Sequence, residues 1–139
     1  MPRRVPLIMI ADDQADVVES LRLLLKGEEL ETRGYSNPAA LVDGMKSQQP
    51  DAVLLDLNYT RDTTSGEEGL DAIARLRSID SDTPIIAMTA WGSIEIAVEA
   101  MRRGAQDFVE KPWDNERLIT IIRTQLALGE ALKRARALA

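Results

Sequence analysis

The sequence contains no cysteine and no histidine among its 139 residues. Without cysteine the chain has no disulfide, no thiolate ligand for zinc and no thiol nucleophile. Without histidine it has no imidazole general base and no side chain that can carry phosphate as phosphohistidine. Thiol and imidazole chemistry are therefore excluded.

Long apolar runs are also missing near the amino terminus. The run within residues 5–11 is only about five residues long, which is too short for a signal peptide and far too short to span a bilayer. We therefore expect a cytoplasmic protein without a membrane contact. The net charge of −6 argues against a main surface that binds nucleic acid, so we expect no direct nucleic-acid binding.

What is present is typical of one globular domain, with 45% hydrophobic and 29% charged residues. The apolar patterning predicts five strands that alternate with five helices. Because the strands are apolar throughout rather than alternating, they indicate a parallel sheet with helices on both faces, an α/β fold. The strands are predicted at 5–11, 29–36 (the weakest), 51–57, 83–90 and 106–112, and the helices at 14–28, 37–50, 67–80, 93–105 and 114–139.

Polar residues stand where the predicted strands end, which in such sheets is the edge where ligands bind. Asp12 and Asp13 end the first strand, Asp56 the third, Thr89 the fourth and Lys111 the fifth. Each alone has an ordinary explanation: acids favour helix amino termini, and the others suit a turn, a strand and a solvated loop. Together, at one sheet edge, they favour a site.

The chemistry that suits this set is phosphoryl transfer. Three close carboxylates repel one another unless a cation joins them, and Mg²⁺ prefers carboxylate and phosphate oxygens. A carboxylate can also act as a nucleophile and form an acyl phosphate. An ammonium group and a hydroxyl could then stabilise and bind the transferred group.

The motifs "ADD", "LLDL", "MTA" and "DFVEKPW", at these spacings, make the chain resemble a response-regulator receiver domain of bacterial two-component signalling. The resemblance runs from about Leu7 to about Leu128. It implies a flavodoxin-like, doubly wound receiver fold. "TAWGS" and "EKPWDNERL" further resemble receivers of enhancer-binding activators that work with the alternative sigma factor.

The resemblance implies a role for each strand-end residue. Asp56 would be the phosphoacceptor. Asp12, Asp13 and Asp56 would hold Mg²⁺ together with the backbone carbonyl of Asn58.

It further implies that Thr89, Ala90 and Lys111 bind the phosphoryl group. Thr89 and Phe108 would be the switch residues. The Lys111–Pro112 peptide bond is expected to be cis.

The implied function is a phosphorylation switch, not a classical enzyme: the domain would catalyse only its own phosphorylation and dephosphorylation. A sensor histidine kinase would donate the phosphoryl group, since the chain has no histidine. The face formed by the fourth helix, fifth strand and fifth helix would control an output such as transcription activation. ATPase and DNA-binding output domains would lie beyond residue 139.

Two other classes are compatible with parts of the pattern. A phosphatase of the haloacid dehalogenase type also uses Asp, Thr, Lys and Mg²⁺, but it needs an Asp-x-Asp motif where this chain has "DDQ". The pattern also shows no separate cap domain. An interaction module that never turns over phosphate would not need the complete residue set.

The sequence departs from the family between residues 58 and 68, where the loop is about five residues longer than usual and lacks a Met-Pro pair. It contains Arg61, Asp62, Thr63 and Thr64. One interpretation is a tolerated surface insertion, because long loops cost little free energy. The other is a cover or partner-contact loop that becomes ordered on phosphorylation.

The last predicted helix continues past the point where a compact receiver would end. We therefore expect a receiver domain over 1–128 and a helical extension over 129–139, since Gly129 alone is too weak to stop the helix. The extension is either a frayed end or a linker that pairs with a second copy of the chain. The predicted seam consists of Leu118, Ile121, Gln125, Leu128, Leu132, Ala135 and Ala139.

Overall fold

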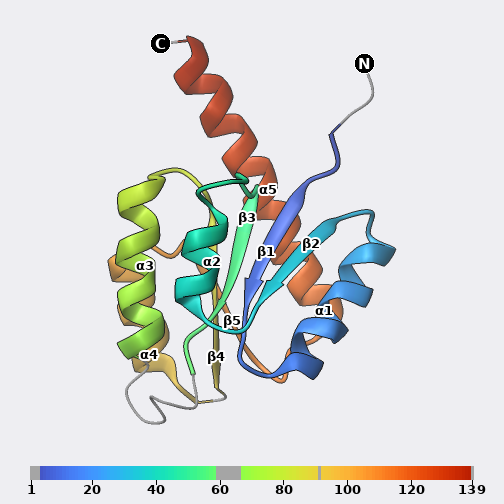
Figure 1. Ribbon diagram of the computed structural model, residues 1–139, viewed down its shortest axis with the longest axis vertical. Helices are drawn as coiled ribbons and strands as arrows, with labels where there is room; N and C mark the ends of the chain where they lie inside the picture. The colour runs from blue at the N-terminus through green and yellow to red at the C-terminus, as the bar shows by residue number, and fades with distance from the viewer. Residues whose placement is uncertain (1–3, 59–66, 91, 139) are drawn as a thin grey trace.

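The fold was obtained as a computed structural model that describes residues 4–58, 67–90 and 92–138. Strands and helices alternate along these residues, as the patterning predicts (Figure 1). The strands are β1 (Leu7–Ala11), β2 (Glu31–Tyr35), β3 (Ala52–Asp56), β4 (Ile85–Ala90) and β5 (Asp107–Lys111). The helices are α1 (Ala15–Gly27), α2 (Pro38–Gly44), α3 (Glu67–Ile79), α4 (Ile94–Arg103) and α5 (Asn115–Leu138).

The strands form one parallel sheet in the order β2-β1-β3-β4-β5. Successive side chains of a strand point to opposite faces, so each strand feeds two separate cores. In β1, Met9 packs with residues of α2, α3 and α4, whereas Ile8 and Ile10 pack with residues of α1 and α5. Both faces are therefore covered, which explains the unbroken apolar runs and confirms the predicted fold class.

β2 lies at the edge of the sheet, and its residues are exposed or only partly buried. This explains why its apolar pattern in the sequence is the weakest of the strands. Gly34 lets α1 approach this edge: a Cβ atom at this position would collide with the side chain of Val18. The register then places Tyr35 beside Ala11, and the Asp12 N–H donates to the Tyr35 carbonyl at 3.0 Å. The edge strand thus helps to fix the backbone at the end of β1.

α5 runs without a break from Asn115 to Leu138 and extends past the amino ends of the strands (Figure 1). Leu118, Ile122 and Gln125 are buried against the sheet. Leu118 and Gln125 are thus wrong as members of an intermolecular seam, because they already face this domain, and Ile121 is partly buried against the same core. Leu128 and Leu132 remain 57% and 39% exposed.

Some expectations concern residues beyond those that the structure describes. These are the predicted loop residues Arg61, Asp62, Thr63 and Thr64, and Ala139 at the end of the predicted seam. Both interpretations of the long loop stay predictions. Among the described residues, no helix combines the length and apolar character needed to cross a membrane.

Candidate phosphoacceptor and metal site

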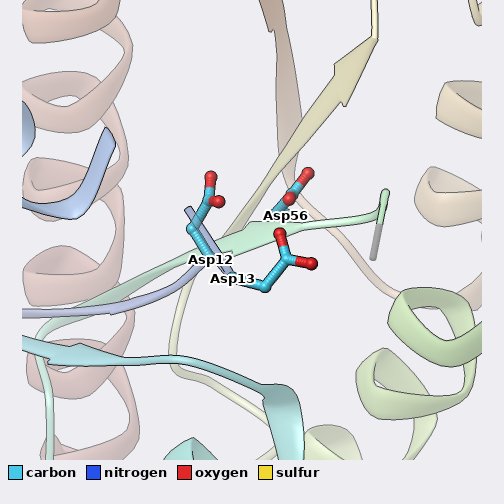
Figure 2. Close-up of side chains that lie close together, drawn as sticks. All are labelled: Asp12, Asp13 and Asp56. Carbon is cyan, nitrogen blue, oxygen red and sulfur yellow. The ribbon is translucent and has the colours of Figure 1, made fainter. Parts of the chain in front are cut away.

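The strand-end residues meet at the carboxyl edge of the sheet. Asp12 and Asp13 directly follow β1, and Asp56 is the last residue of β3. Figure 2 shows their three side chains gathered above the strand ends. One carboxylate oxygen from each lies within 4.8 Å of the other two, so this cluster could hold a metal ion.

Asp56 is buried at the end of β3, with only 1% of its surface exposed, and Asp12 is buried to the same degree. Its Oδ1 accepts the Asn58 N–H at 3.0 Å, whereas Oδ2 has no hydrogen-bond partner in the described part of the chain. Burial raises the pKa of Asp56 to about 6, and the charge of Asp12 adds to this effect. The Asn58 N–H and the Lys111 ammonium oppose it. Oδ1 is therefore held by a backbone N–H, whereas Oδ2 makes no hydrogen bond within the described residues.

The Lys111 ammonium lies between two of the acids. Its Nζ is 2.8 Å from Asp12 Oδ2 and 3.4 Å from Asp56 Oδ2, so the pairing with Asp12 is the tighter one. Asp12 is also buried, and its Oδ1 accepts the Gln14 N–H at 2.9 Å. One ammonium cannot neutralise three carboxylates, and the all-oxygen donor set suits a hard divalent cation.

Thr89 lies in β4, beside β3, and is fully buried. Within the described residues its hydroxyl oxygen has no hydrogen-bond partner, an unusual state for a buried hydroxyl. Ala90, the last residue of β4, is exposed, and its small side chain leaves room at the strand end. The structure therefore brings a buried hydroxyl and an open backbone position to the same edge as the acids.

The fifth strand supplies the remaining predicted positions. Phe108 is partly buried and packs against the core on the α2, α3 and α4 side of the sheet. The Lys111–Pro112 peptide bond is cis.

Two nearby residues were not singled out by sequence reasoning. A Cβ atom on Gly69 would lie 2.7 Å from the Leu57 Cα atom, so only glycine lets α3 begin this close to the end of β3. Glu110 Oε2 accepts the Gly92 N–H at 2.9 Å. Neither contact has a local sequence signal, since each joins segments that meet only in the folded chain.

Comparison with known proteins decides between the receiver and the phosphatase alternatives. The family model of the response regulator receiver domain matches residues 8–123. The chain belongs to this family. The receiver is similar to the transcriptional regulatory protein FixJ of Azorhizobium caulinodans, with 33% identity over 91% of this chain and 57% of the relative. It is also similar to the regulatory protein AtoC of Escherichia coli, with 34% identity over 93% of this chain and 27% of the relative.

Solved structures agree with the receiver fold. The receiver matches NtrX of Brucella abortus with a TM-score of 0.88 and 26% identity over 98% of this chain and 30% of that chain. It matches the N-terminal receiver domain of a response regulator from Bacteroides fragilis with a TM-score of 0.78 and 32% identity, over 88% and 98% of the two chains. The receiver thus spans only part of the length of its curated relatives, 57% of FixJ and 27% of AtoC.

Proposed function

We propose that this receiver takes a phosphoryl group from a sensor histidine kinase onto Asp56 in a Mg²⁺-dependent reaction. The observation that carries the proposal is the buried Asp56 carboxylate, whose Oδ1 accepts a backbone N–H while Oδ2 makes no hydrogen bond among the described residues and faces the Lys111 ammonium. Lys111 and two further acids surround it. The family supports the phosphoacceptor role.

In the proposed reaction Asp56 Oδ2 attacks phosphorus, the P–N bond to the kinase histidine breaks, and an acyl phosphate forms. The Asn58 N–H keeps Oδ1 in place, which leaves Oδ2 for the attack. The Lys111 ammonium, 3.4 Å from Oδ2, stabilises negative charge on the transferred group. Asp12, Asp13, Asp56 and the Asn58 carbonyl would hold Mg²⁺, which supplies further charge neutralisation at the phosphoryl oxygens.

The switch would follow from the new charge on Asp56. The buried, unpartnered Thr89 hydroxyl can donate to a phosphoryl oxygen, and the Ala90 N–H and Lys111 would complete the phosphate contacts. Movement of Thr89 together with Phe108 would change the face formed by α4, β5 and α5. Three apolar side chains of α4 are already exposed there: Ile94 by 54%, Val98 by 52% and Met101 by 40%.

This face would relay the signal in the cytoplasm, through a partner surface or through a second copy of the receiver that pairs along α4, α5 and the carboxyl-terminal helix. The proposed output is transcription activation with the alternative sigma factor, through ATPase and DNA-binding domains beyond residue 139. Support comes from the longer relatives, whose names describe them as regulatory and transcriptional regulatory proteins. The receiver itself would bind neither nucleic acid nor membrane.

The test is phosphorylation by acetyl phosphate, a small donor that needs no kinase. With Mg²⁺ the intact mass should rise by one phosphoryl group, and both chelation of the metal and Asp56→Asn should abolish the increase. Asp43→Asn, at an acid whose side chain is 79% exposed, is the matched control and should label normally. Unchanged labelling of the Asp56→Asn protein would refute the assignment.

A further inference from the structure

Glu110 connects the fifth strand to the turn that follows β4. Its Oε2 accepts the Gly92 N–H at 2.9 Å, across 18 residues of sequence. In the parallel register Glu110 lies opposite Thr89, and Lys111 lies opposite Ala90. Glu110 thus precedes Lys111, one of the proposed phosphate ligands. It lies beside β4, the strand that carries the other two, Thr89 and Ala90.

The turn that accepts this contact has an unusual backbone conformation. Gly92 has a φ of 83°, a backbone conformation that residues with a side chain rarely adopt. Within the described residues the turn has one internal hydrogen bond, from the Ser93 N–H to the Ala90 carbonyl at 3.1 Å. The Glu110 carboxylate joins Gly92 to the neighbouring strand through an exposed hydrogen bond.

We propose that Glu110 is a positioning residue for phosphoryl binding. It fixes the β4–α4 turn, and therefore the Ala90 N–H, relative to the Lys111 ammonium on β5. This inference rests on the proposed function, because it assigns Thr89, Ala90 and Lys111 to one phosphate. Without Glu110, Gly92 has to be ordered when the phosphoryl group binds. The free-energy cost of this ordering weakens the binding of the phosphoryl group.

The experiment compares Glu110→Ala, Glu110→Gln and the control Glu116→Ala, which changes an exposed acid in the first turn of α5. The affinity for beryllofluoride with Mg²⁺, a phosphoryl mimic, is followed by the fluorescence of the two tryptophans. We expect Glu110→Ala to bind about fivefold more weakly, the net worth of about one hydrogen bond. Glu110→Gln keeps an oxygen acceptor and should stay within about twofold of the parent, and Glu116→Ala should be unchanged.

A second readout needs no phosphoryl chemistry. The NMR signal of the Gly92 amide should move in Glu110→Ala and largely return in Glu110→Gln, with the melting temperature of the metal-free protein unchanged. Unaltered or tighter beryllofluoride binding in Glu110→Ala, an equal loss in Glu110→Gln, or an unmoved Gly92 signal would each overturn the proposal. If the parent protein binds no beryllofluoride and takes no label, the proposed function fails instead, while the Gly92 signal still tests the contact.

Discussion

At the scale of single residues, Asp56 shows a conflict between stability and function. Its carboxylate is buried beside Asp12, and its pKa is raised to about 6. An unfolded aspartate has a pKa of about 3.9. Between these two values the folded chain binds more protons than the unfolded chain, so the free energy of unfolding falls as the pH rises. Above about pH 6 the full cost of the buried charge is present in the metal-free protein.

Asp56→Asn removes this charge and should therefore stabilise the metal-free receiver at pH 7.5. The shift of about two units already includes the attraction of Lys111, so we expect Asp56→Asn to raise the free energy of unfolding by up to about 3 kcal/mol. Near pH 3 the difference should largely disappear, because both the folded and the unfolded parent then hold the proton. Urea unfolding at the two pH values measures it.

The control for this measurement is Asp43→Asn, at an acid that is exposed on α2. It should leave the dependence of stability on pH unchanged. A parent protein that is as stable as Asp56→Asn at pH 7.5 would show that Lys111 already compensates the buried charge.

At the scale of secondary-structure elements, α5 is longer than the sheet that it covers, yet its extension still contacts the domain. A Cβ atom on Gly129 would lie 3.1 Å from Cγ of Pro84, the residue directly before β4. Near the end of the helix, the Arg136 guanidinium lies 3.0 Å from the Asp82 carboxylate. Leu118, Ile122, Gln125, Gly129 and Arg136 thus form one stripe along the helix that faces the domain. These contacts with Pro84 and Asp82 fix the direction in which the α5 extension projects from the domain.

Gly129→Ala tests this contact because two effects oppose each other. Alanine favours a helix interior by about 1 kcal/mol over glycine, but here its methyl group crowds the Pro84 ring. In the parent, we expect Gly129→Ala to raise the free energy of unfolding by clearly less than that amount. In a Pro84→Ala background the increase should be closer to the full amount. Urea unfolding of the four proteins gives the coupling between the two sites.

Gly27→Ala in α1 is the matched control, because a Cβ atom there meets nothing within 4 Å. Its effect should be the same in the parent and in the Pro84→Ala background. Equal gains for Gly129→Ala in both backgrounds would show that the Pro84 contact has no energetic effect.

At the scale of the whole molecule, the far side of the α5 extension carries apolar side chains that are exposed in the described part of the chain. Leu128 and Leu132 are exposed on the helix, and Ala135, three residues further on, is exposed as well. The corrected seam is therefore shorter than the sequence pattern indicates. It begins at Leu128 and contains Leu132 and Ala135. So short a seam predicts weak self-association, which phosphorylation can shift through the α4, β5 and α5 face.

The double substitution Leu128→Ser with Leu132→Ser should therefore reduce dimerisation without unfolding the domain, since both side chains are exposed. Light scattering at several concentrations, with and without beryllofluoride, measures the effect. Leu23→Ser, at a leucine that is 57% exposed on α1, is the control and should not change the association. A parent chain that stays monomeric under every condition would rule out pairing by this fragment.

The sequence by itself determined the order of strands and helices, the sheet and the edge where the site lies. Strands buried on both faces must be apolar throughout, so each carboxylate, hydroxyl or ammonium at a strand end stood out against its neighbours. Once five parallel strands are assigned, their carboxyl ends necessarily meet at one edge. Asp12, Asp56 and Lys111 could therefore be brought together without coordinates.

Only the tertiary structure decided which partner each group has and which side of a helix faces inward. Spacings of three and four along α5 fit either an intermolecular seam through Leu118 and Gln125 or a stripe that faces the sheet. In the folded chain these two residues pack against the sheet. Lys111 pairs more closely with Asp12 than with Asp56, and Glu110 reaches Gly92. These choices depend on register and distance between segments far apart in sequence, which no local pattern encodes.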